Sequence, residues 1–420
     1  MRTAISAVFF IAVAALAADK KSASELIDLS RKPARPEFAD ALRGSFSNDE
    51  LQKGVAVATD GPDALVAIEN SGTPQLMLDG QPGPAMRRAG KTNLWFAAAK
   101  FETGLSHSFY YVIDKAAFGG KTDVAVYGSE SYEKSGVPHG TLSDKMVFTS
   151  RIYDGMKCDY WVYVPAEYDS GTPAALMVWQ DGHVMVQRDG NTRSQIVFDN
   201  LTAAKKIPVM IHVFIDPGTI ADKSLRGIEY DTVSDRFARF LRDEILPVIS
   251  AKYNLRKDAY SRAIAGNSSG GICAFNAAWF QPDQFSRVLS RIGSFTNLQQ
   301  NHPGEFDGGN TYPFRVRTEP KRNIRVWLQD GANDLENPFG SWPLQNIHMA
   351  NSLKFRDYDF HLSFGSGTHN AAHGNAELPE EMLWLWRDYQ PSKTSQDFAP
   401  DPAEKDRPFY RVKIDSRPSR

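Results

Sequence analysis

The chain has 420 residues, of which 42% are hydrophobic and 23% charged, a composition that is ordinary for a globular protein. Its formal net charge of -2 at pH 7 argues against nucleic acid as a partner and against adsorption to an anionic membrane. The length predicts two or three domains.

The first residues have the pattern of a signal peptide. Arg2 supplies a positive charge, residues 4–14 form an apolar stretch too short to span a bilayer, and residues 15–17 (Ala-Leu-Ala) fit the small-x-small cleavage pattern. A retained N-terminal anchor is the alternative, but polar residues follow at once. The sequence therefore predicts cleavage after residue 17 and a secreted or periplasmic protein with no membrane contact after cleavage.

The next region predicts a small β domain. Residues 18–55 form an N-terminal segment, polar and mobile to about residue 35 and helical from 36 to 55. From 56 to 132, short β-rich runs alternate with turn-forming residues, and helical periodicity is absent. The runs are Ala64–Glu69, Gln75–Leu78, Leu94–Lys100, His107–Ile113 and Asp123–Tyr127. This pattern predicts an immunoglobulin-like β-sandwich.

Residues 141–390 follow a linker and alternate between strand and helix patterns. The expected strands are Met146–Tyr153, Cys158–Val164, Ala174–Trp179, Val209–Ile215, Arg262–Ala265, Arg287–Ile292, Ile324–Leu328 and Asp359–Phe364. The expected helices include Ser234–Lys252, Gly270–Gln281 and Met382–Tyr389. Such alternation predicts a doubly wound α/β sheet. Residues 391–420, rich in Pro, Asp, Lys and Arg, predict a polar surface tail.

The sharpest motif is Gly-Asn-Ser-Ser-Gly-Gly at residues 266–271, between an apolar strand and a helix pattern. In a strand–turn–helix elbow the middle serine is held in strained backbone geometry with its side chain exposed, and flanking glycines remove Cβ atoms that would collide. We therefore predict an α/β-hydrolase fold with Ser268 as nucleophile. A phosphate-binding helix N-terminus is the alternative, and Ser269 is the rival nucleophile.

Two backbone N–H groups are candidates for an oxyanion hole. Ser269 opens the helix after the nucleophile, so its N–H is one predicted donor. The strand ending at Trp179 is followed by Gln-Asp-Gly-His at residues 180–183, where Gly182 permits a tight turn. The second predicted donor is the N–H of His183, with a plain β-turn as the alternative.

The acid and the histidine should follow the serine in chain order. Asp334 lies in the loop after the strand ending at Leu328 and is the predicted acid, whereas Asp330 and Glu336 are alternatives as solvated charges or caps. His369 follows a Gly-Ser-Gly turn after the last strand and is the predicted base. His373 is its competitor, or a residue that lines the pocket.

The two cysteines, Cys158 and Cys273, lie far apart in the sequence. Export would permit a disulfide, but one opens a strand and the other lies in a helix, so we predict two separately buried thiols. His369 and His373 lack the intervening glutamate of a zinc motif, and we predict neither a metal nor a cofactor.

Several segments resemble the putative esterase family, which includes enterochelin esterases, esterase D-like enzymes and carbohydrate esterase family 1 feruloyl and acetylxylan esterases. They are residues 226–231, 240–247, 265–271, 293–295, 329–334, 340–343 and 368–374. The resemblance covers about residues 141–390 and implies Ser268, Asp334 and His369 as a catalytic triad. The family's histidine often follows a glycine, whereas Thr368 stands there in this chain. Residues 94–96 and 104–111 resemble an early-set module found upstream of several such esterases.

These observations predict a secreted serine esterase that acts through an acyl-enzyme on a small-molecule or polysaccharide-derived ester. Export and the upstream sandwich favour a carbohydrate-linked feruloyl or acetyl ester. A siderophore esterase, a lactonase and a non-catalytic carbohydrate-binding protein are the alternatives. Trp179, Phe295 and Trp342 are candidates for substrate binding, with core packing as the alternative for each. The oligomeric state is left open.

Overall fold

The computed structural model describes residues 20–31, 36–298 and 308–407. The chain divides into two compact units. The smaller comprises residues up to 101 together with 108–121, and the larger comprises residues 102–107 and everything from 122 onwards. The predicted signal peptide, residues 1–17, lies outside the described residues.

The smaller unit begins with three helices, α1 (Ala23–Arg31), α2 (Pro36–Ser45) and α3 (Asn48–Lys53). A capping box between Ser47 and Glu50 starts α3. The predicted mobile stretch to residue 35 is wrong over α1, because Leu26 and Ile27 bury an apolar face against the sheet residues of the same unit.

Two four-stranded sheets follow, in the strand orders β1-β2-β6-β5 and β4-β3-β7-β8. Their strands are β1 (Ala56–Asp60), β2 (Asp63–Glu69), β3 (Gln75–Leu78), β4 (Gln81–Pro82), β5 (Arg87–Arg88), β6 (Leu94–Lys100), β7 (Leu105–Ile113) and β8 (Ala116–Val126). The buried Tyr111 of β7 donates a hydrogen bond to the Ala67 carbonyl of β2, so the sheets pack face to face as the predicted sandwich.

The described part of the larger unit contains an eleven-stranded sheet. Its main order is β15-β14-β11-β13-β12-β16-β17-β18-β21, with β9 and β10 also paired to β11. The strands are β9 (Thr141–Leu142), β10 (Met146–Thr149), β11 (Lys157–Val164), β12 (Ala175–Gln180), β13 (Met210–Ile215), β14 (Thr219–Ile220), β15 (Lys223–Ser224), β16 (Arg262–Asn267), β17 (Arg287–Arg291), β18 (Arg325–Gly331) and β21 (Asp359–Gly365). From β13 to β21 neighbouring strands are parallel.

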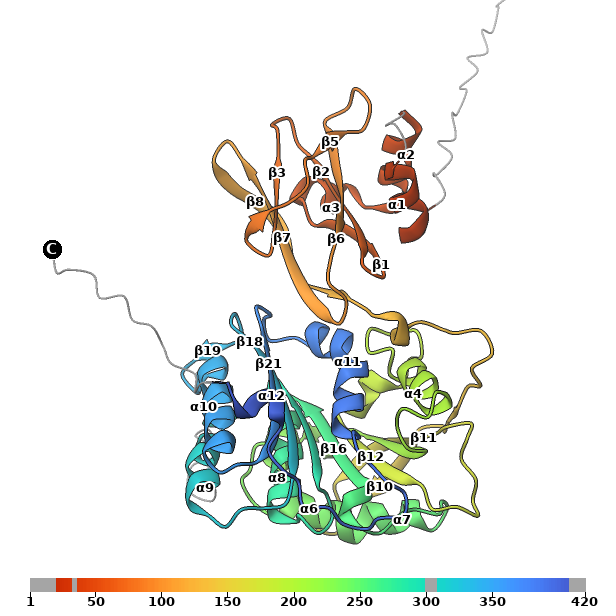
Figure 1. The fold of residues 1–420 in the computed structure, drawn as a ribbon, viewed down its shortest axis with the longest axis vertical. Coiled ribbons are helices and arrows are strands. Elements are labelled where there is room, and N and C mark those ends of the chain that lie inside the picture. Colours follow the sequence, from red (N-terminus) through yellow and green to blue (C-terminus); the bar gives the residue numbers. More distant parts are fainter. Residues whose placement is uncertain (1–19, 32–35, 299–307, 408–420) are drawn as a thin grey trace, which may run out of the picture. The chain divides into compact units, whose positions relative to one another are not determined.

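Helices cover both faces of this sheet, which confirms the doubly wound prediction. One face carries α4 (Ser194–Ala203) and α11 (Ala372–Leu385), and the other carries α5 (Arg226–Tyr230), α6 (Arg236–Phe240), α7 (Leu246–Ser250), α8 (Ser269–Phe280), α9 (Tyr312–Thr318) and α10 (Trp342–Phe355). Figure 1 shows α4 and α11 on one side and α6, α7 and α8 on the other. In the sheet, β13 lies on one side of β12 and β16 on the other. The chain passes from β12 to β13 and then crosses to β16, so the carboxyl ends of β12 and β16 form the switch point where ligands bind in such folds.

The helix predicted over Ser234–Lys252 is interrupted at its middle. Residues Leu241–Ile245 form a π turn between α6 and α7. Pro247 has no N–H to donate to the carbonyl four residues earlier, so the regular α-helical ladder cannot run through this point.

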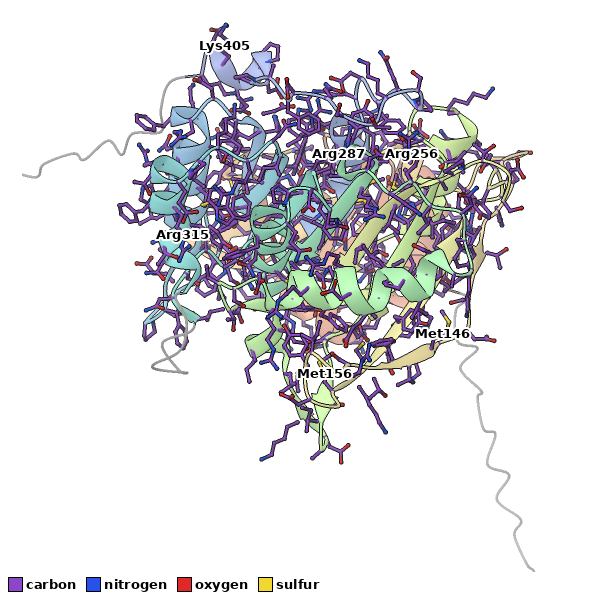
Figure 2. All side chains as sticks on the ribbon, turned by 90° about the horizontal axis from the view of Figure 1, so that it is seen from below. Met146, Met156, Arg256, Arg287, Arg315 and Lys405 are labelled. Carbon is purple, nitrogen blue, oxygen red and sulfur yellow. The ribbon has the colours of Figure 1, made fainter. Side chains whose placement is uncertain are left out.

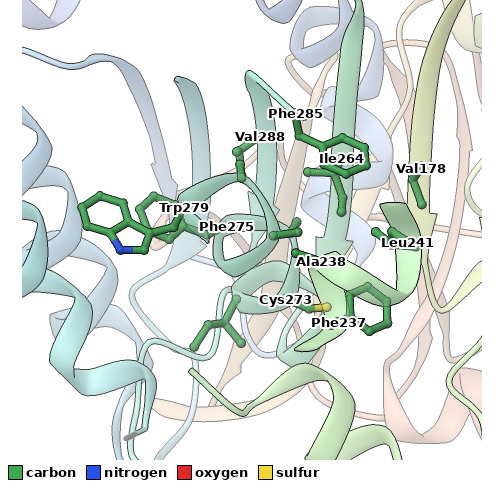
Figure 3. Close-up of a cluster of buried hydrophobic side chains, with 14 of the residues drawn as sticks. Val178, Phe237, Ala238, Leu241, Ile264, Cys273, Phe275, Trp279, Phe285 and Val288 are labelled. Carbon is green, nitrogen blue, oxygen red and sulfur yellow. The ribbon is translucent and has the colours of Figure 1, made fainter. Parts of the chain in front are cut away.

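The core beneath α8 is apolar. Figure 3 shows Val178 of β12, Ile264 of β16 and Val288 of β17 gathered around α8, which contributes Cys273. Cys158 and Cys273 are both buried and unpaired, as predicted, and burial raises both thiol pKa values, that of Cys158 to about 12. This packing fixes the helix whose first turn carries the nucleophile motif.

Residues 391–395 of the predicted polar tail are exposed, but three residues of the following segment, Phe398, Asp401 and Glu404, are buried. Phe398 is buried under the guanidinium groups of Arg287 and Arg325 at 5.2 and 4.7 Å, and Glu404 of α12 (Pro402–Lys405) is buried beside His361. Arg287, labelled in Figure 2, is fully buried and donates to the carbonyl of Leu385. Residues 408–420 lie outside the described part.

Among the described residues, no helix combines the length and apolar character that a membrane crossing requires.

Candidate active site

Ser268 occupies a strained elbow between β16 and α8. Its backbone has φ 57° and ψ -121°, a conformation that costs free energy for a residue with a Cβ. The Ser268 N–H donates to the Arg291 carbonyl at 2.9 Å, and its own carbonyl accepts from the N–H groups of Gly271 and Ser294. A Cβ on Gly266 would lie 2.3 Å from the Gly270 carbonyl oxygen, so only glycine fits there.

The three residues predicted as a triad meet at the carboxyl ends of β16, β18 and β21. His369 Nε2 lies 2.8 Å from Ser268 Oγ, and His369 Nδ1 lies 2.6 Å from Asp334 Oδ1. The Asp334 side chain is fully buried, whereas that of His369 is 21% exposed. A carboxylate that faces Nδ1 holds the hydrogen on that nitrogen, which leaves Nε2 to accept the serine proton.

A second carboxyl group supports the acid. Asp330 is fully buried at the end of β18, where its oxygens accept from Gly331 N–H and Asn346 Nδ2. Burial, with the hydrogen bond and charge of Asp334, raises the pKa of Asp330 to about 9. Burial alone would raise the pKa of Asp334 as well, but hydrogen bonds from His369, Asp330 and Leu335 outweigh it and lower that pKa. Asp330 is therefore a buried carboxyl group close to Asp334, and burial favours its neutral form; it is neither a solvated charge nor a cap.

The loop that carries His369 is tied down on both sides. Asp123, which belongs to the larger unit, accepts hydrogen bonds from both the N–H and the hydroxyl of Thr368 at 2.9 and 2.5 Å. Asn333 donates to the Ser366 carbonyl at 2.7 Å and to the Gly367 carbonyl at 3.1 Å. These contacts hold the residue before the histidine and the turn that precedes it, so the imidazole is delivered by a fixed loop.

A second hydroxyl lies against Ser268. Ser294, three residues after the end of β17, has its Oγ 3.2 Å from Ser268 Oγ. The indole N–H of Trp342 donates to Ser294 Oγ at 3.2 Å, and the same ring stands edge-on to His369 with centroids 5.6 Å apart. Trp342 is 2% exposed and therefore contacts the proposed catalytic groups as a buried wall of the site.

Only one of the two predicted oxyanion donors keeps an open N–H. Ser269 is the first residue of α8, so its N–H has no acceptor inside the helix. The His183 prediction is wrong, because its N–H donates to Asp216 Oδ1 at 2.9 Å. Asp181, two residues earlier in the same loop, forms a bidentate ion pair with Arg226, and each of its two hydrogen bonds is 2.8 Å long. This ion pair anchors the loop to α5.

Trp179 and Phe295 were predicted at the substrate, but both lie in the core. Trp179 is 3% exposed and donates its indole N–H to His212 Nδ1. Phe295 is fully buried and packs against Phe275 and Tyr312. Both faces of β12 are covered, and Trp179 lies on the face that packs against α4, whereas Phe295 packs against Phe275 of α8.

His373 also departs from its predicted place in the pocket. It lies in α11, 4% exposed, with neither ring nitrogen hydrogen-bonded to a described residue. Burial and the nearby charge of Arg291 lower its pKa to about 4. A neutral, buried imidazole fills space beside Gly365, where an added Cβ would approach it to 2.6 Å.

Sequence reasoning missed two residues near Ser268 and His369, Ser294 and Asp123, and misinterpreted a third, Asp330. Ser294 belongs to the Gly-Ser-Phe segment that carries the family resemblance, which was a usable signal. Asp330 precedes the predicted acid by four residues and only its burial reveals its role. Asp123 comes from β8, more than two hundred residues before the loop it holds, and no local pattern marks it.

Comparison with known proteins identifies the family of this chain. The model of the family described as "Putative esterase" matches residues 154–385, which is more than half of the chain. The chain belongs to the putative esterase family. This member is 23% identical over 244 residues to the iron(III) enterobactin esterase of Dickeya dadantii (strain 3937), covering 56% of this chain and 53% of that protein. The iron(III) enterobactin esterase of Escherichia coli (strain K12) is 24% identical over 193 residues, 46% of this chain and 45% of that one.

This esterase-family chain thus spans about half the length of the curated relatives it matches. Its fold is similar to the crystal structure of enterochelin esterase from Shigella flexneri, with a TM-score of 0.53 and 16% sequence identity. The match covers 80% of this chain and 96% of that one, and it demonstrates a common fold. Within the described ranges, no group of three or more His, Cys, Asp or Glu side chains is arranged to hold a metal ion.

We expect Gly266→Ala to destabilise the protein severely, because its Cβ would collide with backbone that cannot move away. Thermal unfolding followed by circular dichroism measures the effect. Gly128→Ala is the matched control, since the nearest atom to its new Cβ is 4.0 Å away. Equal melting temperatures for the two variants would contradict the tight elbow.

We expect Asp330→Asn to change how stability depends on pH. The folded-state pKa of Asp330 is raised to about 9, whereas the unfolded value is about 4. Its stabilising contribution is therefore complete below pH 4 and declines as pH rises towards 9. The asparagine amide stays neutral at every pH. The melting temperature of the variant minus that of the parent should therefore increase between pH 5 and pH 8. Glu336→Gln, at an exposed carboxylate, is the control, and a pH-independent difference for Asp330→Asn would exclude the raised pKa of Asp330.

Proposed function

We propose that this protein is an exported serine esterase that hydrolyses carboxylic esters through an acyl-enzyme. The observation that carries the proposal is the unbroken hydrogen-bond chain from Ser268 through His369 to Asp334 at a strained elbow. Membership of the esterase family supports the reaction class, and the leader-like N-terminus supports export.

In the proposed mechanism Ser268 Oγ attacks the ester carbonyl carbon while its proton passes to His369 Nε2. Asp334 orients the imidazole and stabilises its charged form. The Ser269 N–H and the positive end of α8 stabilise the oxyanion, and a donor of this kind typically contributes about 3–4 kcal/mol. His369 then protonates the leaving alcohol, and water hydrolyses the acyl-enzyme with the same residue as base.

The substrate is a separate part of the proposal. An exported esterase with an upstream β-sandwich suits a carbohydrate-linked feruloyl or acetyl ester, and this is our first candidate. The sequence relatives are named as iron(III) enterobactin esterases, which favours a siderophore ester as the second. Both substrates present an ester carbonyl to the same triad, so the chemistry proposed above does not depend on the choice.

We expect Ser268→Ala to lose at least a thousandfold in kcat on p-nitrophenyl acetate with an unchanged circular dichroism spectrum. His369→Ala and Asp334→Asn should be far more damaging than His183→Ala and Glu336→Gln, which alter exposed residues of the same types. Because the triad acts as a unit, Ser268→Ala combined with His369→Ala should be little worse than Ser268→Ala alone. Turnover by Ser268→Ala within tenfold of the parent would exclude the assignment.

A panel of esters separates the two substrate candidates. We expect kcat/KM for methyl ferulate and acetylated xylo-oligosaccharides to exceed that for catecholoyl-serine esters, because export places the enzyme with extracellular polysaccharide. Simple p-nitrophenyl esters serve as the common reference for triad competence. A clear preference for the catecholate esters would reject the carbohydrate candidate and leave the esterase mechanism intact.

A further inference from the structure

Ser294 lies beside the proposed nucleophile and is shielded from solvent. Its Oγ is 3.2 Å from Ser268 Oγ, and its backbone N–H donates to the Ser268 carbonyl at 3.1 Å. The residue is 1% exposed. A buried hydroxyl has to give its hydrogen to a neighbouring acceptor, so the direction of the Ser268–Ser294 hydrogen bond matters.

Trp342 constrains that direction from one side. Its indole N–H can only donate, and it lies 3.2 Å from Ser294 Oγ. Ser294 is therefore the acceptor in this hydrogen bond, and its own hydrogen is available for Ser268.

His369 constrains the direction from the other side. The Asp334 carboxylate faces Nδ1 at 2.6 Å, so Nδ1 carries the hydrogen and Nε2 accepts. Nε2 lies 2.8 Å from Ser268 Oγ and takes the single hydrogen of that hydroxyl. Ser268 has no further hydrogen to give, so Ser294 must be the donor to it. The two constraints are independent and agree.

We propose that Ser294 is a further catalytic residue, whose hydroxyl, oriented by Trp342, donates a hydrogen bond to Ser268 Oγ during turnover. The inference rests on the proposed role of Ser268 as nucleophile. In deacylation the oxygen of water bonds to the acyl carbon and the water proton passes to His369. The bond between that carbon and Ser268 Oγ then breaks, its electron pair goes to Oγ, and Oγ recovers a proton from His369.

Negative charge develops on Oγ in that last step, because Oγ is the leaving group. A hydrogen bond to a charged oxygen is about twice as strong as a neutral one, so the Ser294 hydroxyl stabilises the transition state more than the ground state. In acylation the same bond holds the Oγ rotamer while the proton leaves for His369. The effect should therefore fall on rate constants, with deacylation slowed more than acylation. Because deacylation then limits turnover, kcat and KM should fall together, and kcat/KM, which reports acylation, should change less.

The test compares Ser294→Ala with Ser290→Ala, using stopped-flow hydrolysis of p-nitrophenyl acetate. Ser290 is a matched control because it is fully buried on β17 and its Oγ has no partner among the described residues. We expect Ser294→Ala to lower kcat about tenfold or more, corresponding to about 1.4 kcal/mol of barrier. A burst of one equivalent of p-nitrophenol should be retained, and Ser290→Ala should stay within twofold of the parent.

Two intermediate variants keep the test decisive if alanine disturbs the local fold. Trp342→Phe keeps a ring against His369 but removes the orienting N–H, and Ser294→Cys keeps a weak donor at the same position. Each should have a deacylation rate between those of the parent and Ser294→Ala. Ser294→Ala turnover within twofold of Ser290→Ala, or intermediate variants slower than alanine, would overturn the proposal.

Labelling with a fluorophosphonate separates this inference from the proposed function. The labelled residue is identified by peptide mass mapping, and the rate reports the reactivity of Ser268 without a natural substrate. A parent protein that is neither labelled at Ser268 nor active overturns both proposals. A parent that is labelled and active, with Ser294→Ala and Ser290→Ala labelled and turning over equally fast, overturns only the role of Ser294.

Discussion

The strained backbone at Ser268 is the constraint on which the site depends. A positive φ at a residue with a Cβ persists only where the surroundings enforce it. Here β16 on one side and α8 on the other leave no alternative path, and the Ser268 amide and carbonyl are both hydrogen-bonded to neighbouring turns. The apolar packing of α8 against β12, β16 and β17 holds the elbow in place.

From that elbow a directed chain of hydrogen bonds extends in both directions. On one side it passes through His369 to the Asp334 carboxylate, and on the other through Ser294 to Trp342. A carboxylate at one end and an indole N–H at the other leave a single consistent placement of the hydrogens. The site is therefore organised for one direction of proton movement, from Ser268 to His369.

The elements that the sequence predicted most accurately were those with strong local patterns. Helix α8 and the buried strands of the large sheet occur within a few residues of their expected places, because apolar runs bounded by Gly, Pro and Asp mark buried strands. These strands are β11, β12, β13, β16, β17, β18 and β21. The departures occurred where distant packing decides. Helix α1 and residues 396–405 look polar in sequence, yet Leu26, Ile27, Phe398 and Glu404 are buried by partners from elsewhere in the chain. The helix predicted over 234–252 is present over residues 236–250, with a π turn before Pro247, which lacks an N–H.

The sequence by itself determined the elbow at Ser268 and the loops that bring Asp334 and His369 to it, because glycine spacing and strand ends are local features. Tertiary structure alone decided which side chains share the site. Trp179 and Phe295 are packed in the core, and the His183 N–H donates to Asp216. Asp123, on a distant strand, accepts a hydrogen bond from the loop that carries the histidine. The physical reason is that a side chain's direction and its hydrogen-bond partners depend on the whole packed arrangement, which a local pattern does not encode.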